Sequence, residues 1–263
     1  MVQKRVYEEK MKNQYKQTAE QYNKYGKLYH KYRVSGKNFF NSYVDMPTVL
    51  SFLKNVRGKK ILDIGCGSGL YAKILKKRGA KVHGIDISKT MTELAKKEVP
   101  GADFRVGSIL KLPFKKNSFD IAISALMLDY VKDYDKALKE VHRILKPKGI
   151  YIFSIGNPLF ECRRKTKLGG KIYKVLGYSK DMRKVIGWNY FKEGWIPWKL
   201  GKMRFKEYRL TMESRISSIL KNGFSIEGYK DAKPVTAGRR ISPSDYRIFS
   251  RLPIFCAFKL KKK

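Results

Sequence analysis

The stretch ILDIGCGSG, residues 61–69, joins a short apolar run to three glycines on alternate positions. Residues 70–78 follow with the apolar spacing of an amphipathic helix. Glycine lets a backbone approach a ligand closely, and parallel sheets bind ligands beyond the carboxyl ends of their strands. The stretch therefore predicts a ligand-binding turn between the first strand and the first helix of a parallel α/β sheet.

Strand and helix patterns alternate outward from this turn. Strands are predicted at 59–65, 81–87, 102–108, 118–124, 149–156, 224–229 and 253–260. Ser88 is a predicted N-cap, and a helix from Tyr134 is expected to end at Pro147 and Gly149. Alternation of this kind is typical of βαβ units. The fold class is therefore α/β: a Rossmann-like, doubly wound, mostly parallel seven-stranded sheet, with an N-terminal helical segment and an insert before the last two strands.

The length of 263 residues fits one domain. We divide it into an N-terminal helical cap (1–59), a ligand-binding core (60–156), an insert (157–205) and closing helix and strands (206–263). We find no secretory signal and no apolar run of about 20 residues. Cys66, Cys162 and Cys256 are too far apart for a disulfide framework or a zinc cluster. We expect a cytoplasmic protein with buried thiols, no metal site and no transmembrane segment.

The charge of the chain is strongly basic. Lys and Arg number 59 against 22 Asp and Glu, a net charge of +37. Residues 156–263 carry the densest excess, with 27 basic and 8 acidic residues. Such a field attracts RNA or another polyanion. A solvated, Lys-rich surface without a partner explains the composition equally well.

The spacing of the glycines restricts the ligand of the turn. A dinucleotide loop needs a glycine at position 70, where this chain has Leu70, and no phosphate-binding G-x-x-x-x-G-K motif is present. Asp86 ends the second predicted strand, where a carboxylate can accept hydrogen bonds from both ribose hydroxyls. Gly107 and Ser108 end the third predicted strand, where an adenine edge could be read. Asp86 suits an adenosine without a 2′-phosphate. The loop, the ribose acid and the adenine position fall on successive strand ends, and together they are more specific than the loop alone.

These motifs resemble those of class I S-adenosylmethionine-dependent methyltransferases of the type 11 group. The resemblance rests on ILDIGCGSG, on GIDIS (84–88), on LKPKG (145–149) and on two longer stretches (105–124 and 208–234). Residues 15–25 resemble the lead-in to the cofactor-covering helix of that group. Most of the chain is included, except roughly 157–205 and 235–252. The resemblance implies an enzyme, a SAM-dependent methyltransferase, with S-adenosyl-L-methionine as its cofactor.

The resemblance also implies the cofactor-binding residues. It implies that the turn binds the methionine and ribose part of the cofactor and that Leu126 contacts the methionine part. Asp86 would bind the ribose, and the residues that follow the second and third strands would bind the adenine. Tyr15 and Tyr22 either cover the cofactor or form the apolar face of a helix. The full set is Asp63, Gly65, Cys66, Gly67, Gly69, Asp86, Ile87, Met91, Ser108, Ile109, Leu126, Tyr15 and Tyr22.

The acceptor side is described less fully by the sequence. Asn157 ends the fifth strand, where related enzymes often have a histidine that could take a proton; Asn can only orient an acceptor. Asp129 and Tyr130 follow the fourth strand and are further substrate-binding candidates. The insert is rich in aromatic residues among cations, which predicts either base stacking or, as we prefer, a lid over an apolar substrate: Trp188, Tyr190, Phe191, Trp195 and Trp198. No catalytic residue is assigned.

Three functions remain open at this point. The first is methylation of a small or lipid-like metabolite, which fits the type 11 resemblance and the aromatic insert. The second is methylation of RNA, such as tRNA, which fits the net charge of +37. The third is a non-catalytic binding module that keeps the same fold.

Overall fold

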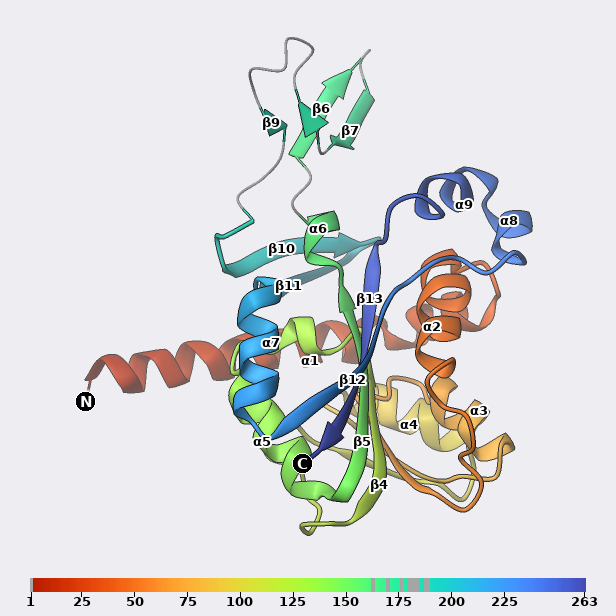
Figure 1. Cartoon of the computed structure of the whole chain (residues 1–263), viewed down its shortest axis with the longest axis vertical. Coiled ribbons are helices and arrows are strands. Elements are labelled where there is room, and N and C mark those ends of the chain that lie inside the picture. Colours follow the sequence, from red (N-terminus) through yellow and green to blue (C-terminus); the bar gives the residue numbers. More distant parts are fainter. Residues whose placement is uncertain (1, 162–163, 169–170, 176, 179–184, 187–189) are drawn as a thin grey trace.

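Seven strands form one sheet at the centre of the computed structural model (Figure 1), which describes residues 2–161, 164–168, 171–175, 177–178, 185–186 and 190–263. The order across the sheet is β12-β13-β5-β4-β1-β2-β3. Strands β1 to β5 pair in parallel, whereas β13 is antiparallel to both of its neighbours. The predicted seven-stranded, mostly parallel sheet is confirmed. Its strands are β1 (Lys60–Ile64), β2 (Lys81–Asp86), β3 (Asp103–Val106), β4 (Phe119–Ala125), β5 (Leu145–Gly156), β12 (Phe224–Asp231) and β13 (Phe255–Lys262).

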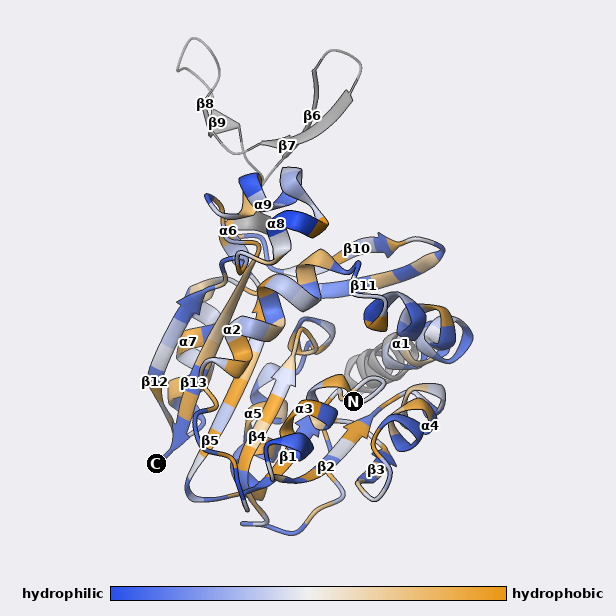
Figure 2. Ribbon diagram, turned by 90° about the vertical axis from the view of Figure 1, so that its right-hand side faces the viewer, coloured by the Kyte–Doolittle hydropathy of each residue, from blue (hydrophilic) through white to orange (hydrophobic). Residues whose placement is uncertain are grey.

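Helices cover both faces of the sheet because its central strands are apolar on both sides. In Figure 2 much of β4 and β5 is coloured hydrophobic. Leu62 of β1 packs in the cluster with α5 and α7, whereas its neighbour Ile61 packs in the cluster with α2, α3 and α4. Because successive side chains of a strand point to opposite faces of the sheet, neighbouring residues of β1 pack in two separate hydrophobic cores. The helices are α2 (Met46–Leu50), α3 (Leu70–Lys77), α4 (Lys89–Glu98), α5 (Tyr134–Ile144) and α7 (Met212–Lys221).

Two predicted helix ends have different outcomes. Ser88 caps α4 as predicted, because its hydroxyl accepts a hydrogen bond from the Met91 N–H at 3.2 Å. The helix from Tyr134 ends at Ile144, earlier than predicted, and Pro147 and Gly149 belong to the first part of β5. A register shift where β5 pairs with β4 accommodates these two residues within the strand.

The N-terminal segment is dominated by one long helix, α1 (Val2–Val34), which packs against α4 and β11. A π-helical turn, η1 (Phe40–Asp45), then leads into α2. In the described part of the chain, no helix combines the length and the apolar composition needed to cross a bilayer. Cys66 and Cys256 are buried free thiols, as predicted, whereas Cys162 lies outside the described residues.

The insert ends in a hairpin that lies near α1 and the tip of β5. The predicted boundary at 205 falls inside its second strand. Between β12 and β13, where a loop was expected, the chain forms α8 (Gly238–Ile241) and α9 (Pro243–Phe249). The other elements of this part are α6 (Pro158–Glu161), β6 (Arg164–Leu168), β7 (Lys171–Val175), β8 (Gly177–Tyr178), β9 (Val185–Ile186), β10 (Gly194–Leu200) and β11 (Met203–Arg209).

A buried ion pair joins α7 to the end of β4. Arg215 is 1% exposed, and its Nη2 donates to Asp129 Oδ1 at 2.9 Å. Asp129 lies in a 3₁₀ turn, η2 (Leu128–Tyr130), and its Oδ2 accepts from the Gly156 N–H at 2.7 Å. The Arg215 guanidinium also lies 5.7 Å from the centre of the Tyr134 ring. The pair therefore fixes the position of η2, which carries Tyr130.

This pair generates a stability prediction. Removal of one partner leaves the other charge buried without compensation, at a cost of about 3–5 kcal/mol. Arg215→Met and Asp129→Ala should each lower the free energy of unfolding by about 3 kcal/mol in denaturant titrations. The double variant should lose clearly less than the sum of the single losses. Additivity to within about 0.5 kcal/mol would show that the two charges do not interact.

Candidate active site

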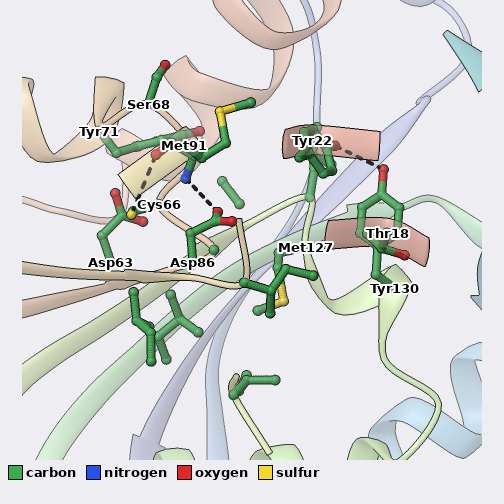
Figure 3. Close-up of a pocket in the computed structure, with 18 of the residues that line it drawn as sticks. Thr18, Tyr22, Asp63, Cys66, Ser68, Tyr71, Asp86, Met91, Met127 and Tyr130 are labelled. Carbon is green, nitrogen blue, oxygen red and sulfur yellow. Dashed lines mark hydrogen bonds between the residues drawn. The ribbon is translucent and has the colours of Figure 1, made fainter. Parts of the chain in front are cut away.

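A cavity lies beyond the carboxyl ends of β1, β2 and β4, under α1 and η1 (Figure 3). Twelve of the thirteen predicted cofactor residues line it, which leaves Gly69 apart. The cavity also receives residues that sequence reasoning missed. These are Thr18, Tyr29, Arg33, Asn41, Asp45, Ile64, Ser68, Leu70, Tyr71, Ile85, Ala125, Met127 and Val131.

The glycines of the turn serve different purposes. Gly65 and Gly67 have φ of +71° and +52°, in the left-handed region that favours glycine. A Cβ on Gly65 would lie 2.4 Å from Met127 Cγ, so this position admits no side chain. A Cβ on Gly67 would meet nothing within 4 Å, so this backbone borders open space. Gly69 instead packs on α4, where its Cβ would lie 3.1 Å from that of Ala95.

Asp86 connects the end of β2 to the glycine turn. Its two carboxylate oxygens accept hydrogen bonds from the N–H groups of Gly67 and Ser88, each at 2.9 Å. Burial raises the pKa of Asp86, and these backbone N–H groups act in the opposite direction. A carboxylate has about four acceptor positions, so acceptor capacity remains for a ligand. The predicted ribose acid therefore stands where a pair of hydroxyls could reach it.

Asp63 and Arg33 supply opposite charges to the same cavity. The Asp63 side chain is buried at the end of β1, and its Oδ2 has no hydrogen-bond partner among the described residues. The Nε of Arg33, from α1, is also buried without a partner in the described part of the chain. Burial, and then the charge of Asp86, raise the pKa of Asp63 to about 7. Unpartnered buried polar atoms in a cavity indicate a ligand with complementary groups.

A further missed pair supports the cavity from the side of η1. The Tyr71 hydroxyl donates to Asp45 Oδ2 at 2.7 Å, and both side chains are buried. Burial raises the pKa of the Asp45 carboxyl, while the hydroxyls of Ser154 and Tyr71 oppose the rise. Asp45 is the single acid between Glu20 and Asp63, and that isolation is the one signal by which the sequence could have indicated it.

Helix α1 is held over the cavity by polar contacts with α4. The side-chain oxygen of Asn23 accepts from the Ser88 hydroxyl at 2.8 Å and from the Thr90 N–H at 3.2 Å. The Asn23 carbonyl accepts from the Thr90 hydroxyl at 3.0 Å. Tyr15 and Tyr22 both line the cavity, which favours the covering interpretation over a merely apolar helix face.

The remaining predicted cofactor residues lie around the cavity as expected. Met91, Ile87, Ser108 and Ile109 line its side nearest β2 and β3. The Ser108 hydroxyl accepts from the Leu110 N–H at 3.2 Å, so part of its capacity serves its own loop. Leu126 has φ of +52°, an uncommon conformation for a branched residue, and its N–H is held by Ser154. Such strain is typical of functional sites.

A second cavity, of about 390 Å³, adjoins the first. The two share five residues: Tyr22, Tyr29, Asn41, Leu126 and Tyr130. The hydroxyls of Tyr22 and Tyr130 lie 3.4 Å apart where the cavities meet (Figure 3). We call this second space the aromatic cavity. Its other aromatic lining residues are Tyr32, Phe40, Trp198, Tyr208 and Phe255.

The predicted acceptor residues divide between this cavity and the framework. Tyr130 and Asp129 line the aromatic cavity, although both carboxylate oxygens of Asp129 already accept hydrogen bonds. Asn157 lines neither cavity. Its amide donates to Asp231 at 2.8 Å, and its Oδ1 accepts from the Leu159 N–H. The end of β12 that carries Asp231 is separated from β5 by β13 alone.

The aromatic residues of the insert also divide. Trp198 stacks on Phe205 with ring centres 4.9 Å apart and lines the aromatic cavity. Trp195 packs instead on Tyr208, and Phe191 is 84% exposed. The Tyr190 hydroxyl accepts from the Met212 N–H at 3.0 Å. Trp188 lies outside the described residues.

Comparisons with known proteins agree with this geometry. The type 11 family model described as a methyltransferase domain matches residues 62–153. An uncharacterized protein of Haemophilus influenzae is 28% identical over 89% of this chain and 93% of its own length. A demethylmenaquinone methyltransferase of Chlorobaculum tepidum is 39% identical over 37% of this chain and 40% of its own length. This chain therefore spans about two fifths of that enzyme.

A solved structure extends the likeness to most of the chain. The S-adenosylmethionine-dependent methyltransferase from Mesorhizobium loti superposes with a TM-score of 0.67 at 26% identity. The match covers 82% of this chain and 96% of that protein.

The residues of the first cavity fit S-adenosylmethionine. Asp63 Oδ2 can accept from the ammonium group of its methionine part, and Arg33 can donate to the carboxylate. Asp86 can accept from the ribose hydroxyls, and the open backbone at Gly67 leaves room beside them. The unpartnered Oδ2 of Asp63 and Nε of Arg33 thus each have a complementary group on the cofactor.

Asp63 makes cofactor binding dependent on pH. Without cofactor, the pKa of Asp63 is about 7, so its carboxylate becomes protonated as the pH falls below that value. The protonated form no longer offers a negative charge to the ammonium group of the cofactor. Calorimetry should therefore show affinity for S-adenosylmethionine weakening by up to about tenfold per pH unit below pH 7. Asp63→Asn should bind weakly with little change between pH 5.5 and pH 8.

Thermal stability provides the control for this experiment. Since the folded-state pKa of Asp63 is raised, its ionised form destabilises the fold at high pH. Asp63→Asn should therefore raise the melting temperature more at pH 8 than at pH 5.5. A variant that is less stable than the parent at pH 8 would show that the Asp63 carboxylate supports the fold.

Arg33 is tested with two ligands. Arg33→Ala should weaken S-adenosylmethionine binding by about 10- to 100-fold, the value of a charge-assisted hydrogen bond. Binding of 5′-methylthioadenosine should hardly change, since this ligand has no carboxylate. Equal losses for both ligands would mean that Arg33 only supports the lid formed by α1.

Proposed function

We propose that this chain, whose core is a class I S-adenosylmethionine-dependent methyltransferase domain, methylates a small, largely apolar acceptor in the aromatic cavity. The supporting observation is that the two cavities share one wall, formed by Tyr22, Tyr130 and Leu126. An acceptor in the second cavity would lie beside the methyl donor in the first. Proximity and orientation of this kind account for a large part of the rate of group transfer.

The lining of the aromatic cavity favours an acceptor with a ring and an oxygen. Three of its rings, Tyr22, Tyr130 and Trp198, pack around Phe205 of β11, and the ring centres of the contacting pairs lie 4.9–6.4 Å apart. The indole N–H of Trp198 is buried without a hydrogen-bond partner among the described residues. A buried donor of this kind favours a carbonyl or hydroxyl oxygen on the ligand.

The side chains at the shared wall act by orientation. S-Adenosylmethionine supplies an electrophilic methyl group on a sulfonium. Burial raises the pKa of both Tyr22 and Tyr130, so both hydroxyls stay protonated at neutral pH. They can therefore donate hydrogen bonds to an acceptor oxygen, but they cannot remove its proton. Glu207 of β11 also lines the aromatic cavity and is the nearest candidate for that step.

One relative supports an acceptor of this class. The Chlorobaculum tepidum protein is a demethylmenaquinone methyltransferase by name, and it matches 37% of this chain. In this chain β10 and β11 complete the aromatic cavity. The likeness therefore supports the class of acceptor, and the identity of the acceptor depends on residues particular to this chain.

RNA is the second candidate acceptor, and the net charge of +37 favours it. An RNA acceptor would have to place one base in the aromatic cavity and its phosphates on the basic surface. Binding by such contacts weakens steeply with salt.

The decisive experiment follows a labelled methyl group from S-adenosylmethionine into cell extract divided into lipid, small-molecule, RNA and protein fractions. We expect the label in an apolar small-molecule or lipid fraction. Label in RNA would favour the second candidate. Cofactor binding without transfer to any fraction would favour a non-catalytic binding module.

Two tryptophan variants form a matched pair. Trp198→Ala should lower kcat/KM for the labelled acceptor by at least about tenfold, through loss of a stacking surface and a hydrogen-bond donor. Its affinity for S-adenosylmethionine should stay unchanged. Trp195→Ala, in the same strand but outside the cavity lining, should retain activity. Equal losses in both variants would mean that the hairpin matters only as a support.

A further inference from the structure

A third cavity lies at the opposite edge of the sheet from the cofactor. It has a volume of about 680 Å³ and is formed by the loop after α2, the first residues of β4 and β5, and the outer strands β12 and β13. Because ligands of the first cavity bind at the carboxyl ends of the strands, this groove cannot hold the methyl donor. We call it the lysine groove, after the six lysines among its lining residues: Lys54, Lys59, Lys146, Lys148, Lys230 and Lys259.

The charge of the lysine groove is only partly neutralised. Its two carboxylates are Asp120 and Glu227. Asp120 pairs with Lys146 at 2.8 Å, and Glu227 pairs with Lys259 at 3.1 Å.

The other four lysines remain as positive charges. Lys230 lies over the Phe52 ring, 5.0 Å from its centre, and donates to the Ser51 hydroxyl. Lys54, Lys59 and Lys148 form no ion pair within the described residues. Clustered positive charge in a concave surface concentrates anions more strongly than the same charge on a convex one.

Lys148 carries a second, independent signal. It stands between Pro147 and Gly149 with φ of +60°, in the left-handed region that a lysine adopts only at an energetic cost. A glycine would serve this bend of the backbone without strain. Strain of this kind at an exposed position suggests that the ammonium group, rather than the backbone, is what the position requires.

We propose that the lysine groove binds a chain of linked phosphates, in a nucleic-acid strand or in a free polyphosphate. Lysine ammonium groups act as point charges, which suits phosphates without demanding a fixed geometry. Phe52 is the one aromatic side chain among the described residues that line the groove, and Lys230 lies over one face of its ring. Binding should therefore depend on phosphates and be indifferent to base sequence.

The experiment uses the full chain with two probes, sodium tripolyphosphate and a labelled ten-nucleotide oligouridine. The groove variant is Lys54→Ala/Lys59→Ala/Lys148→Gly. The control is Lys77→Ala/Lys96→Ala/Lys97→Ala, which removes the same charge from exposed positions on α3 and α4. Affinity for at least one probe should fall about tenfold or more in the groove variant and within about twofold in the control.

The dependence on salt gives a second readout. Since about 0.7 counterions are released for each phosphate contact with a single strand, the slope of log K against log salt should become shallower by about 2 in the groove variant. Loss of tripolyphosphate binding alone would identify a small polyphosphate as the ligand, and loss of oligouridine binding would identify a strand. Equal weakening in the groove and control variants would overturn the proposal.

Lys148→Gly alone separates binding from folding. It should raise the melting temperature by about 2 °C, because it relieves left-handed strain, and should also weaken phosphate binding. A rise in melting temperature without weaker binding would remove Lys148 from the site. Affinity for S-adenosylmethionine should stay unchanged in every variant, so failure of this proposal leaves the proposed methyl transfer intact.

Discussion

The contact between Asp86 and the glycine turn is the constraint on which the site depends. One carboxylate oxygen holds the Gly67 N–H and the other holds the Ser88 N–H. The first contact fixes the shape of the turn after β1, and the second places Ser88 at the start of α4. Ser88 in turn binds Asn23, which secures α1 over the cavity. A single buried acid thus connects the strand ends, the turn and the covering helix.

The charged groups of the same cavity lower the stability of the protein when no cofactor is bound. Asp63, Asp86 and Asp45 are all acids whose pKa values burial raises. Arg33 offsets some of this charge from the opposite side. A ligand with one cation, one anion and two hydroxyls relieves each of these groups in turn. The site is therefore less stable alone than with S-adenosylmethionine, as is common where binding requires unsatisfied groups.

The two edges of the sheet serve different chemistry. At the carboxyl edge, backbone N–H groups, acids and rings enclose two joined cavities. At the amino edge, lysines surround an open groove. A parallel sheet permits this division because all of its parallel strands present the same end to the same edge. The buried Arg215–Asp129 pair belongs to the first edge, where it positions the turn that carries Tyr130.

The sequence by itself determined the sheet, the cofactor and about half of the residues that line its cavity. Strand and helix periods and the positions of Gly65, Gly67 and Asp86 are local features, and the topology of parallel strands brings their ends together. Only the tertiary structure revealed Arg33, Asp45 and Arg215, because a charge enters a core through partners distant in the chain. It also showed that Asn157 binds Asp231, because the order of the edge strands places the end of β12 near the end of β5. Trp198, rather than Trp195, lines the aromatic cavity because the register of the hairpin decides which side chains face it.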